Sequence, residues 1–272
     1  MATDTFRHFL LMLMNTETSF GKPGACLDRE WLSHRLDLFR RYCLPSVLNQ
    51  SSTNFTWLLF THEQTPEEIR NEFLRLVDSI SNARVVWCTK FNQITLRTAI
   101  WKELTSKISH IITTRMDNDD AIAPTFIETI QKQFNGQKAE FVNFPIGYKH
   151  HLGKLYRQNN MASPFCSFIE NRRGFRTVYS TSHRQIADVA PVKQVRTDPL
   201  WMSVIHDKNA INTVTGKRTL AENIGKEFRF LNLNKPKESI FEVLADVCRY
   251  YLWSFQRKLR RWMNESARSL HE

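Results

Sequence analysis

A cluster of acidic residues directly follows an apolar segment in the middle of the chain. Residues 111–116 read Ile-Ile-Thr-Thr-Arg-Met, a largely β-branched and apolar run of the kind that forms buried strands. Asp117, Asp119 and Asp120 then fall within four residues. Carboxylates gathered at a strand end repel one another and lose hydration, which is costly unless a cation lies among them. The cluster therefore predicts a site for a hard divalent cation, Mg²⁺ or Mn²⁺, which takes oxygen ligands and can bridge carboxylates to a substrate's phosphates.

Two other interpretations of this cluster were weighed. Asp and Asn gather in turns and at helix N-caps for local reasons, so Asp120 could cap a helix that begins near Pro124. An EF-hand loop would place Asp117, Asp119 and Glu128 at positions one, three and twelve, but its sixth residue would be Ile122, where that loop needs glycine. The EF-hand is excluded, and the turn or cap stays open.

Alternating strand and helix patterns must position the cluster. Apolar runs of strand length are separated by segments in which apolar residues recur at helical spacing. This alternation predicts a parallel sheet with helices on its faces, where ligands bind at the carboxyl ends of the strands. The predicted strands are 6–14, 55–60, 84–87 and the run from 111, and the predicted helices are 28–45, one opened by a Thr65–Glu68 capping box, and 96–108.

Neither of two common phosphate-binding loops is present. The sequence has no G-x-G-x-x-G after the first predicted strand and no G-x-x-x-x-G-K-[ST]. Rossmann-type dinucleotide binding and P-loop chemistry are therefore disfavoured. A nucleotide would have to be held by a metal ion and by side chains.

The second half of the chain is less regular. Residues 141–144 predict a strand, and the segment from Gly147 to about Pro199 is loop-rich, polar and aromatic, which is typical of the side of a site that sets specificity. An apolar run from Pro199 then ends at His206. A histidine at a strand end is more often a structural hydrogen-bonding residue, but the acidic cluster makes a metal-ligand role about equally plausible.

The composition limits the kinds of ligand that the protein can bind and the cellular compartment in which it works. The 272 residues carry 38 Lys and Arg against 27 Asp and Glu, a net charge of +11, which predicts attraction to phosphates in nucleotides, nucleic acid or anionic lipid. The 5 cysteines form no C-x-x-C pair, so a disulfide framework or zinc site is disfavoured and a reducing cytosol fits best. Residues 9–14 are too short for a membrane span and lack a signal-peptide cleavage site. We expect a cytoplasmic protein, and a peripheral location at the inner face of the membrane stays open.

The C-terminal segment has a pattern of its own. Residues 232–238 have the composition of a linker. Beyond them, one apolar stripe from Ile240 to Trp262 lies opposite a basic face, the pattern of a helix lying on an anionic membrane. A helix packed on the body with a solvated basic face fits equally well. The expected domains are therefore 1–231 and an appended linker and basic amphipathic helix, 232–272.

Four segments carry a resemblance to a known family, namely Arg35–Gln50, Asn54–Phe60, Thr114–Ala121 and Trp201–His206. They resemble the family of rhamnosyl transferases, which is similar to glycosyltransferases of the GT-A fold. The resemblance spans about residues 6–212 and implies an α/β fold with a mainly parallel sheet flanked by helices. It also implies transfer of a sugar, for this family rhamnose, from a nucleotide-sugar to a hydroxyl of a glycan or lipid-linked acceptor. Met14 and Asn15 stand where the family pattern leads us to expect an arginine.

The resemblance implies roles for individual residues. Asp119 would bind the divalent cation directly, with Asp117 orienting the ribose or a metal-bound water and His206 as a further ligand. Arg115 would approach the phosphates or pair with Asp117, and these two roles stay open. Glu170 is the candidate general base for the acceptor hydroxyl. Three other carboxylates are not excluded from that role, namely Asp188, Asp198 and Asp207.

Two other classes of function were considered. A metal-dependent nuclease or phosphotransferase would need a second carboxylate set and a basic face around the first, and the sequence shows neither, which disfavours nucleic acid as a partner. A non-catalytic peripheral membrane protein would depend on the segment from Ile240 and would not need Asp117 or Asp119.

Overall fold

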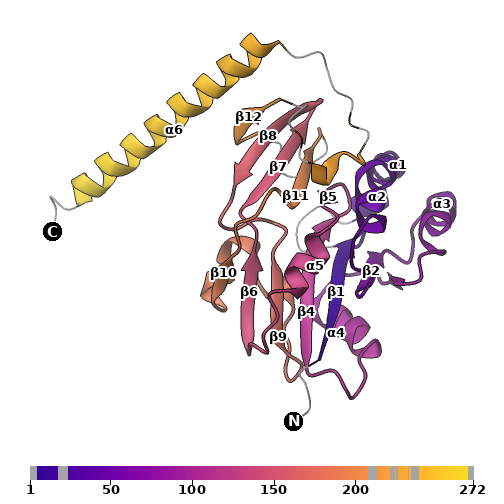
Figure 1. The fold of residues 1–272 in the computed structure, drawn as a ribbon. Coiled ribbons are helices and arrows are strands. Elements are labelled where there is room, and N and C mark those ends of the chain that lie inside the picture. Colours follow the sequence, from indigo (N-terminus) through magenta and orange to yellow (C-terminus); the bar gives the residue numbers. More distant parts are fainter. Residues whose placement is uncertain are drawn as a thin grey trace.

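A seven-stranded, mainly parallel sheet lies at the centre of the fold, in the order β10-β6-β9-β4-β1-β2-β3 (Figure 1). The computed structural model describes residues 5–17, 24–207, 213–220, 224, 226–231, 233 and 239–268, with side chains up to 256. Strands β1, β2, β3 and β4 run parallel, and β9 runs antiparallel between β4 and β6. The strands are β1 Phe6–Leu13, β2 Thr56–Thr61, β3 Ala83–Trp87, β4 His110–Asp117, β6 Ala139–Asn143, β9 Ser167–Asn171 and β10 Val192–Gln194.

Helical segments cover both faces of this sheet. Because successive residues of a strand point to opposite faces, Leu10 and Met12 of β1 join one apolar cluster and Phe9 and Leu11 join another. The first cluster packs under α1, α2, α3 and α5, and the second under α4 and two short 3₁₀ segments. The predicted α/β class is confirmed. The helical bounds are α1 Arg29–Leu38, α2 Leu44–Leu48, α3 Glu67–Val77, α4 Gln93–Lys102, α5 Phe126–Gln131, η3 Val178–Ser180 and η4 His183–Asp188.

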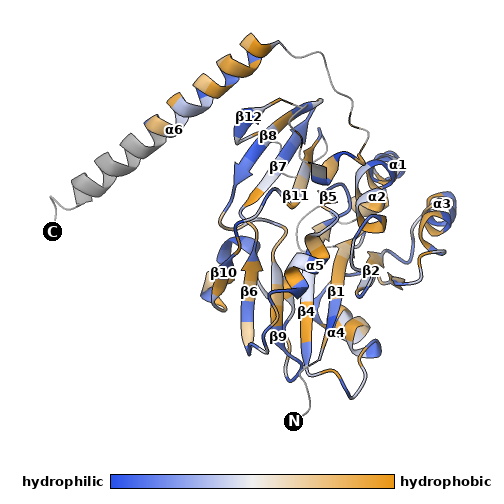
Figure 2. Ribbon diagram, in the orientation of Figure 1, coloured by the Kyte–Doolittle hydropathy of each residue, from blue (hydrophilic) through white to orange (hydrophobic). Residues whose placement is uncertain are grey.

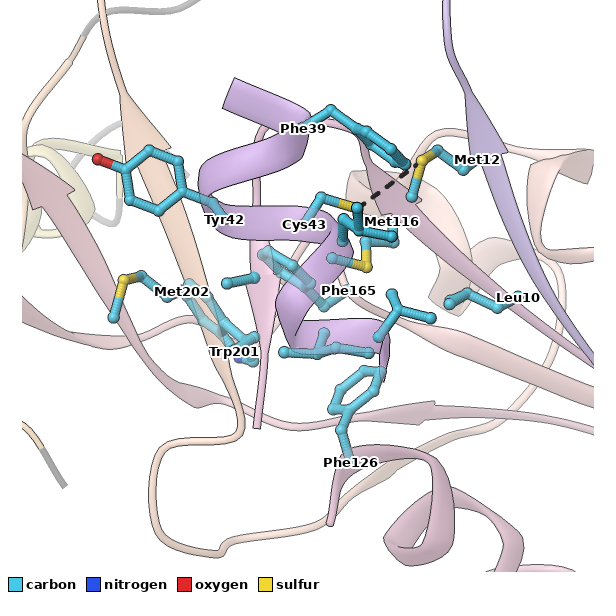
Figure 3. Packing of buried hydrophobic residues seen from close by; sticks show 14 of the residues in the cluster. Leu10, Met12, Phe39, Tyr42, Cys43, Met116, Phe126, Phe165, Trp201 and Met202 are labelled. Atoms are coloured by element: carbon cyan, nitrogen blue, oxygen red, sulfur yellow. Dashed lines mark hydrogen bonds between the residues drawn. The ribbon is translucent and has the colours of Figure 1, made fainter. Parts of the chain in front are cut away.

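A π-helical turn, η2 (Phe39–Cys43), joins α1 to α2 and packs at the centre of the first cluster (Figure 3). Phe39 stacks on Trp57 with ring centroids 5.8 Å apart, and the Cys43 Sγ lies 3.9 Å from the Met12 Sδ. The helix predicted to end at Pro45 therefore continues to Leu48. Pro45 lies directly after the π-helical turn, where the regular i to i−4 hydrogen-bond pattern of the helix is already interrupted.

Two other predicted helix boundaries were wrong. The capping box does not form, because α3 begins at Glu67 after Pro66 and has no side-chain cap. The Thr65 hydroxyl donates instead to the carbonyl of His62. Helix α4 ends at Lys102, well before the predicted end at Ile108.

A second, five-stranded sheet, in the order β12-β8-β7-β11-β5, continues from the first. The acidic turn, residues 117–120, leads directly from β4 of the first sheet to β5 of the second, and β11 pairs with β5. The carboxyl ends of β4 and β11 therefore meet where the two sheets join. The strands are β5 Ala121–Ile122, β7 Ile146–His151, β8 Lys154–Asn159, β11 Trp201–Ile205 and β12 Lys217–Thr219.

The segment predicted to be loop-rich, from Gly147 to about Pro199, lies mostly outside strands but contains β8 and β9 and most of β7, together with β10. Strands β7 and β8 form a hairpin whose turn residues, Leu152 and Gly153, have φ of 49° and 79°. Two positive φ values are what a two-residue type I′ turn requires. The hairpin was not predicted from the sequence, because the first turn residue is leucine, whereas asparagine or glycine is usual at this position.

Gly147 gives β7 room for a large ring of β11. A Cβ at this position would lie 2.1 Å from the Trp201 Cδ2, which is too close for two carbon atoms that are not bonded. Trp201 is itself buried, and its Nε1 donates to the carbonyl of Phe144. Because the ring cannot move without losing that hydrogen bond, we expect Gly147→Ala to lower the free energy of unfolding by about 1–3 kcal/mol, measured by urea denaturation. The loss should shrink in a Trp201→Phe background, and an equal loss in both backgrounds would contradict the clash.

A long helix, α6 (Ile240–Arg268), contacts the second sheet at β12 (Figure 1). The predicted linker 232–238 lies outside the described residues except for Leu233. Among the helices described, none combines the length and apolar content needed to cross a bilayer.

Candidate functional site

The acidic turn follows the carboxyl end of β4 and lies at the junction of the two sheets. Asp117 is the last residue of β4 and its side chain is half-exposed, whereas Asp119 and Asp120 are buried. One carboxylate oxygen of each lies within 4.8 Å of the others. The structure thus brings three carboxylates to one point.

Asp119 is held by two cationic or polar partners. The Arg35 Nη1 donates to its Oδ2 at 2.5 Å, and the Arg35 Nη2 donates to its Oδ1 at 3.1 Å. The His206 Nε2 lies 2.9 Å from the same Oδ2. Burial alone would raise the pKa of Asp119, but the Arg35 charge and the hydrogen bond from His206 hold this pKa below its ordinary value. Asp119 is therefore ionised at neutral pH.

Helix α1 carries Arg35 to the acidic turn. The helix begins after Asp28, whose side chain accepts the backbone N–H of Trp31, and it buries Leu32 and Leu36 against the sheet. Arg35 lies beside this buried face, and its Nη2 also donates to the Asn118 Oδ1. Sequence analysis did not assign Arg35 a role. The available signal was a charged residue between two buried leucines of an amphipathic helix, a position where arginine needs a carboxylate partner.

His206 was predicted at a strand end with a structural and a ligand role both open. The structure places it directly after β11, between Asp119 and His34, whose Nε2 lies 3.2 Å from the His206 Nδ1. Since an ionised carboxylate only accepts hydrogen bonds, Nε2 of His206 donates to Asp119. The 2.9 Å spacing would also suit two neighbouring ligands of an octahedral ion, which are roughly 3 Å apart when each lies about 2.1 Å from the metal. Binding through Nε2 would require the ring to carry its hydrogen on Nδ1 instead.

Asp120 ties the acidic turn to the second sheet. Its Oδ1 accepts the backbone N–H of Val204 in β11 at 2.9 Å. The interpretation of Asp120 as a helix cap was wrong, because α5 begins at Phe126 after Thr125. Burial and then repulsion from Asp119 and Asp117 raise the pKa of Asp120 well above its ordinary value.

Arg115 points to the same edge from β4, two residues before Asp117. Its Nη2 lies 3.7 Å from the Asp117 Oδ1, and its guanidinium lies 5.2 Å from the ring centroid of Tyr179. Burial lowers the pKa of Arg115, but Tyr179 and Asp117 outweigh it and the pKa is raised. Of the two roles left open for Arg115, the pair with Asp117 is present in the structure.

Glu170 does not lie at the acidic turn. It stands opposite Ile111 on β4, six residues from Asp117 and so roughly 20 Å away along the strand. Because β9 runs antiparallel to β4, a residue late in β9 lies at the amino end of β4. Its carboxylate accepts the backbone N–H groups of Arg176 and Thr177 at 2.8 and 2.7 Å. The sequence-based placement of Glu170 beside the reacting groups is therefore corrected, and its contacts support a structural role.

Glu170 makes the stability depend on pH. Burial raises its pKa to about 7, although the two backbone N–H groups oppose this. Since the unfolded carboxyl has a pKa near 4.3, the folded chain holds a proton that the unfolded chain has released, and the contribution of Glu170 to stability falls as pH rises from about 4 to about 7. We expect Glu170→Gln to become more stable relative to wild type by about 3 kcal/mol between pH 4.5 and 8, measured by urea denaturation at both pH values. Parallel pH profiles would contradict this.

Three other carboxylates were considered as the general base. Asp188 and Asp198 are exposed on other parts of the chain. Asp207 follows His206, and one ligand atom of Asp207 lies within 4.8 Å of those of His34 and His206. Of these three, Asp207 is the one that the structure brings beside the acidic turn.

The residues present fit a hard divalent cation. Three carboxylates whose oxygens lie within 4.8 Å of one another supply the oxygen-rich set that Mg²⁺ or Mn²⁺ requires. Asp119 would attract a cation less strongly than an unpaired carboxylate would, because Arg35 donates hydrogen bonds to both of its oxygens. Asp117 is half-exposed and is therefore the most accessible of the three carboxylates to an incoming ligand.

Comparison with known proteins identifies one family. A family model described as "Putative rhamnosyl transferase" matches residues 15–218. No curated protein matches. Among solved structures, TarS 1–349 of S. aureus in complex with UDP-GlcNAc is 8% identical, with 90% of this chain and 71% of that chain covered and a TM-score of 0.49. Rv0371c of Mycobacterium tuberculosis H37Rv is 15% identical, with 72% and 90% covered and a TM-score of 0.36. These likenesses are too distant to bear on the function.

Proposed function

The chain belongs to the family described as "Putative rhamnosyl transferase", and on that premise we propose that it is a metal-dependent glycosyltransferase. It would move a sugar, for which rhamnose is the family's candidate, from a nucleotide-sugar to a hydroxyl of a glycan or a lipid-linked acceptor. The observation that carries this proposal is the meeting of the acidic turn with His206 where β4 and β11 end.

We assign the cation to the acidic turn. Asp117, Asp119 and Asp120 would hold it with their carboxylates, and His206 would be a further ligand, as its spacing from Asp119 allows. When bound, the ion would supply neutralisation of the charge that builds on the departing nucleoside diphosphate.

Two arginine side chains would help to position the donor. Arg35 fixes Asp119 from two sides and so sets the direction in which that carboxylate points. Arg115, held by Asp117, is a candidate for a phosphate contact once a diphosphate competes for it. Asp207 replaces Glu170 as our candidate for the base that takes the proton of the acceptor hydroxyl.

The proposed division of the chain follows the family match. Residues 1–231 would form the transferase domain, since the match covers 15–218, and residues 232–272 would be an appended linker and helix. The absence of a membrane-crossing helix from the described residues is compatible with the cytoplasmic location that we propose.

The rival readings have less support. A two-metal nuclease would need a second set made only of carboxylates, and within the described residues the other two potential metal-binding groups each mix histidine with other side chains. Membership of a transferase family argues against a non-catalytic membrane protein.

Donor binding tests the proposed function. A ligand that binds only the folded state at one hundred times its Kd adds about 2.7 kcal/mol of stability. We expect dTDP-rhamnose or another nucleoside diphosphate sugar to raise the unfolding midpoint by about 5 °C in the presence of Mn²⁺ and much less with EDTA. Glu128→Gln, which changes an exposed carboxylate on α5, is the control and should respond as wild type does. If no nucleotide sugar in a broad panel shifts the midpoint, the proposal is wrong.

A further inference from the structure

The first turns of α6 expose a run of large apolar side chains. Figure 2 shows hydrophobic residues along this part of the helix. Six of them are each between 53% and 83% exposed, far more than the side chains of a helix packed on a core. They are Ile240, Phe241, Leu244, Tyr251, Leu252 and Phe255.

The body contacts a different side of the helix. Val243 is buried, and Asp246 lies 3.7 Å from the Arg218 Nε of β12. At 100° per residue, these six residues fall on one arc of about 120°. Val243, Asp246 and Trp253, which is 47% exposed, fall outside this arc. Among the described residues, Lys217 of β12 reaches the edge of this arc, its Nζ lying 5.3 Å from the ring centroid of Tyr251, and all six arc residues stay at least 53% exposed.

Positive charge accompanies this arc. From Arg249 to Arg268 the sequence has six Lys and Arg residues and one acidic residue, Glu265. Arg249 is itself largely exposed. By helical spacing, Arg249 falls outside the apolar arc. An apolar stripe with a basic opposite face is suited to a surface that is apolar inside and anionic outside.

We propose that α6 lies in the plane of an anionic lipid bilayer, with its apolar arc at the acyl boundary and its basic residues among the headgroups. The helix is about 43 Å long, and it does not cross the bilayer because its apolar content is too low. A second copy of the chain is the rival occupant. Pairing two such helices side by side would bring basic segments of like charge together, which disfavours a parallel pair. The proposal is independent of the donor and of the transfer reaction.

Vesicle co-sedimentation of the full chain tests this inference. We expect binding to vesicles that contain phosphatidylglycerol, weaker binding to pure phosphatidylcholine, and weakening of the former by salt. The variant Phe241→Ser/Leu252→Ser/Phe255→Ser should bind at least tenfold more weakly. The matched control, Gln256→Ser/Asn264→Ser, changes neutral residues off the arc and should bind as wild type does.

The outcomes separate the occupants. Unchanged donor-induced thermal shifts in both variants would show that the transferase domain is intact. Absence of vesicle binding by wild type, or equal binding by both variants, overturns the proposal. A different result would assign the arc to a second copy of the chain. In that case light scattering would show a wild-type dimer that does not bind vesicles, and the triple substitution would convert this dimer to a monomer.

Discussion

Asp119→Asn is expected to lower kcat/KM for sugar transfer at least a hundredfold. Asparagine keeps the shape of the side chain but removes the charge that pairs with Arg35 and, in our proposal, with the cation. A hundredfold loss corresponds to about 2.7 kcal/mol of transition-state stabilisation, which is the size expected for one lost charge-assisted contact in a buried site. Steady-state turnover of the nucleotide sugar identified by thermal shift measures it.

The same substitution must be separated from misfolding. Glu128→Gln makes the same chemical change on an exposed carboxylate and should leave turnover unchanged. Mn²⁺ affinity, followed by calorimetry at a concentration where both variants remain folded, should fall for Asp119→Asn alone. Turnover that survives within about tenfold, a loss of only about 1.4 kcal/mol, would mean that Asp119 is not a metal ligand.

Arg35→Met is expected to lower the free energy of unfolding by about 3–5 kcal/mol. Methionine fills much of the space of the arginine stem but leaves the buried Asp119 carboxylate without its guanidinium partner. The loss arises from an uncompensated buried charge, so it should become smaller when Asp119→Asn removes that charge. Urea denaturation of the two single variants and the double variant gives the coupling free energy.

An exposed pair provides the control for this cycle. Arg29 and Glu68 form a salt bridge whose side chains are 73% and 55% exposed, compared with 13% and 4% for Arg35 and Asp119. Exposed pairs contribute about 0–1 kcal/mol, so Arg29→Met should change stability by less than 1 kcal/mol. Equal losses for Arg29→Met and Arg35→Met would show that burial of the Arg35 pair has no special effect.

The first half of the fold could be predicted because its signals are periodic and local. Strands β1, β2 and β4 are largely buried apolar runs, β3 is a short run at the edge of the sheet, and Asp28 marks a helix start that forms as expected. The acidic turn was found for the same reason, since an abrupt change from apolar to acidic residues at a strand end depends on neighbours in sequence only.

The site required contacts that sequence spacing does not contain. Arg35 and Asp119 are 84 residues apart, and nothing local indicates that α1 ends over the acidic turn. His206 was recognised only as the end of a strand, because its distance from Asp119 depends on the second sheet. Glu170 was misplaced because the direction of β9 cannot be inferred from its composition, and an antiparallel strand reverses which of its residues meet the site.

The π-helical turn between α1 and α2 fixes the length of this part of the chain. On one side of it Arg35 reaches Asp119, and on the other side Gln50 donates to the carbonyl of Ala123 and accepts the N–H of Ile127. An α-helix turns by about 100° per residue, so deleting or inserting one residue between Arg35 and Gln50 would swing one of the two side chains out of contact. Family members should therefore vary in residue type along this segment but keep its number of residues.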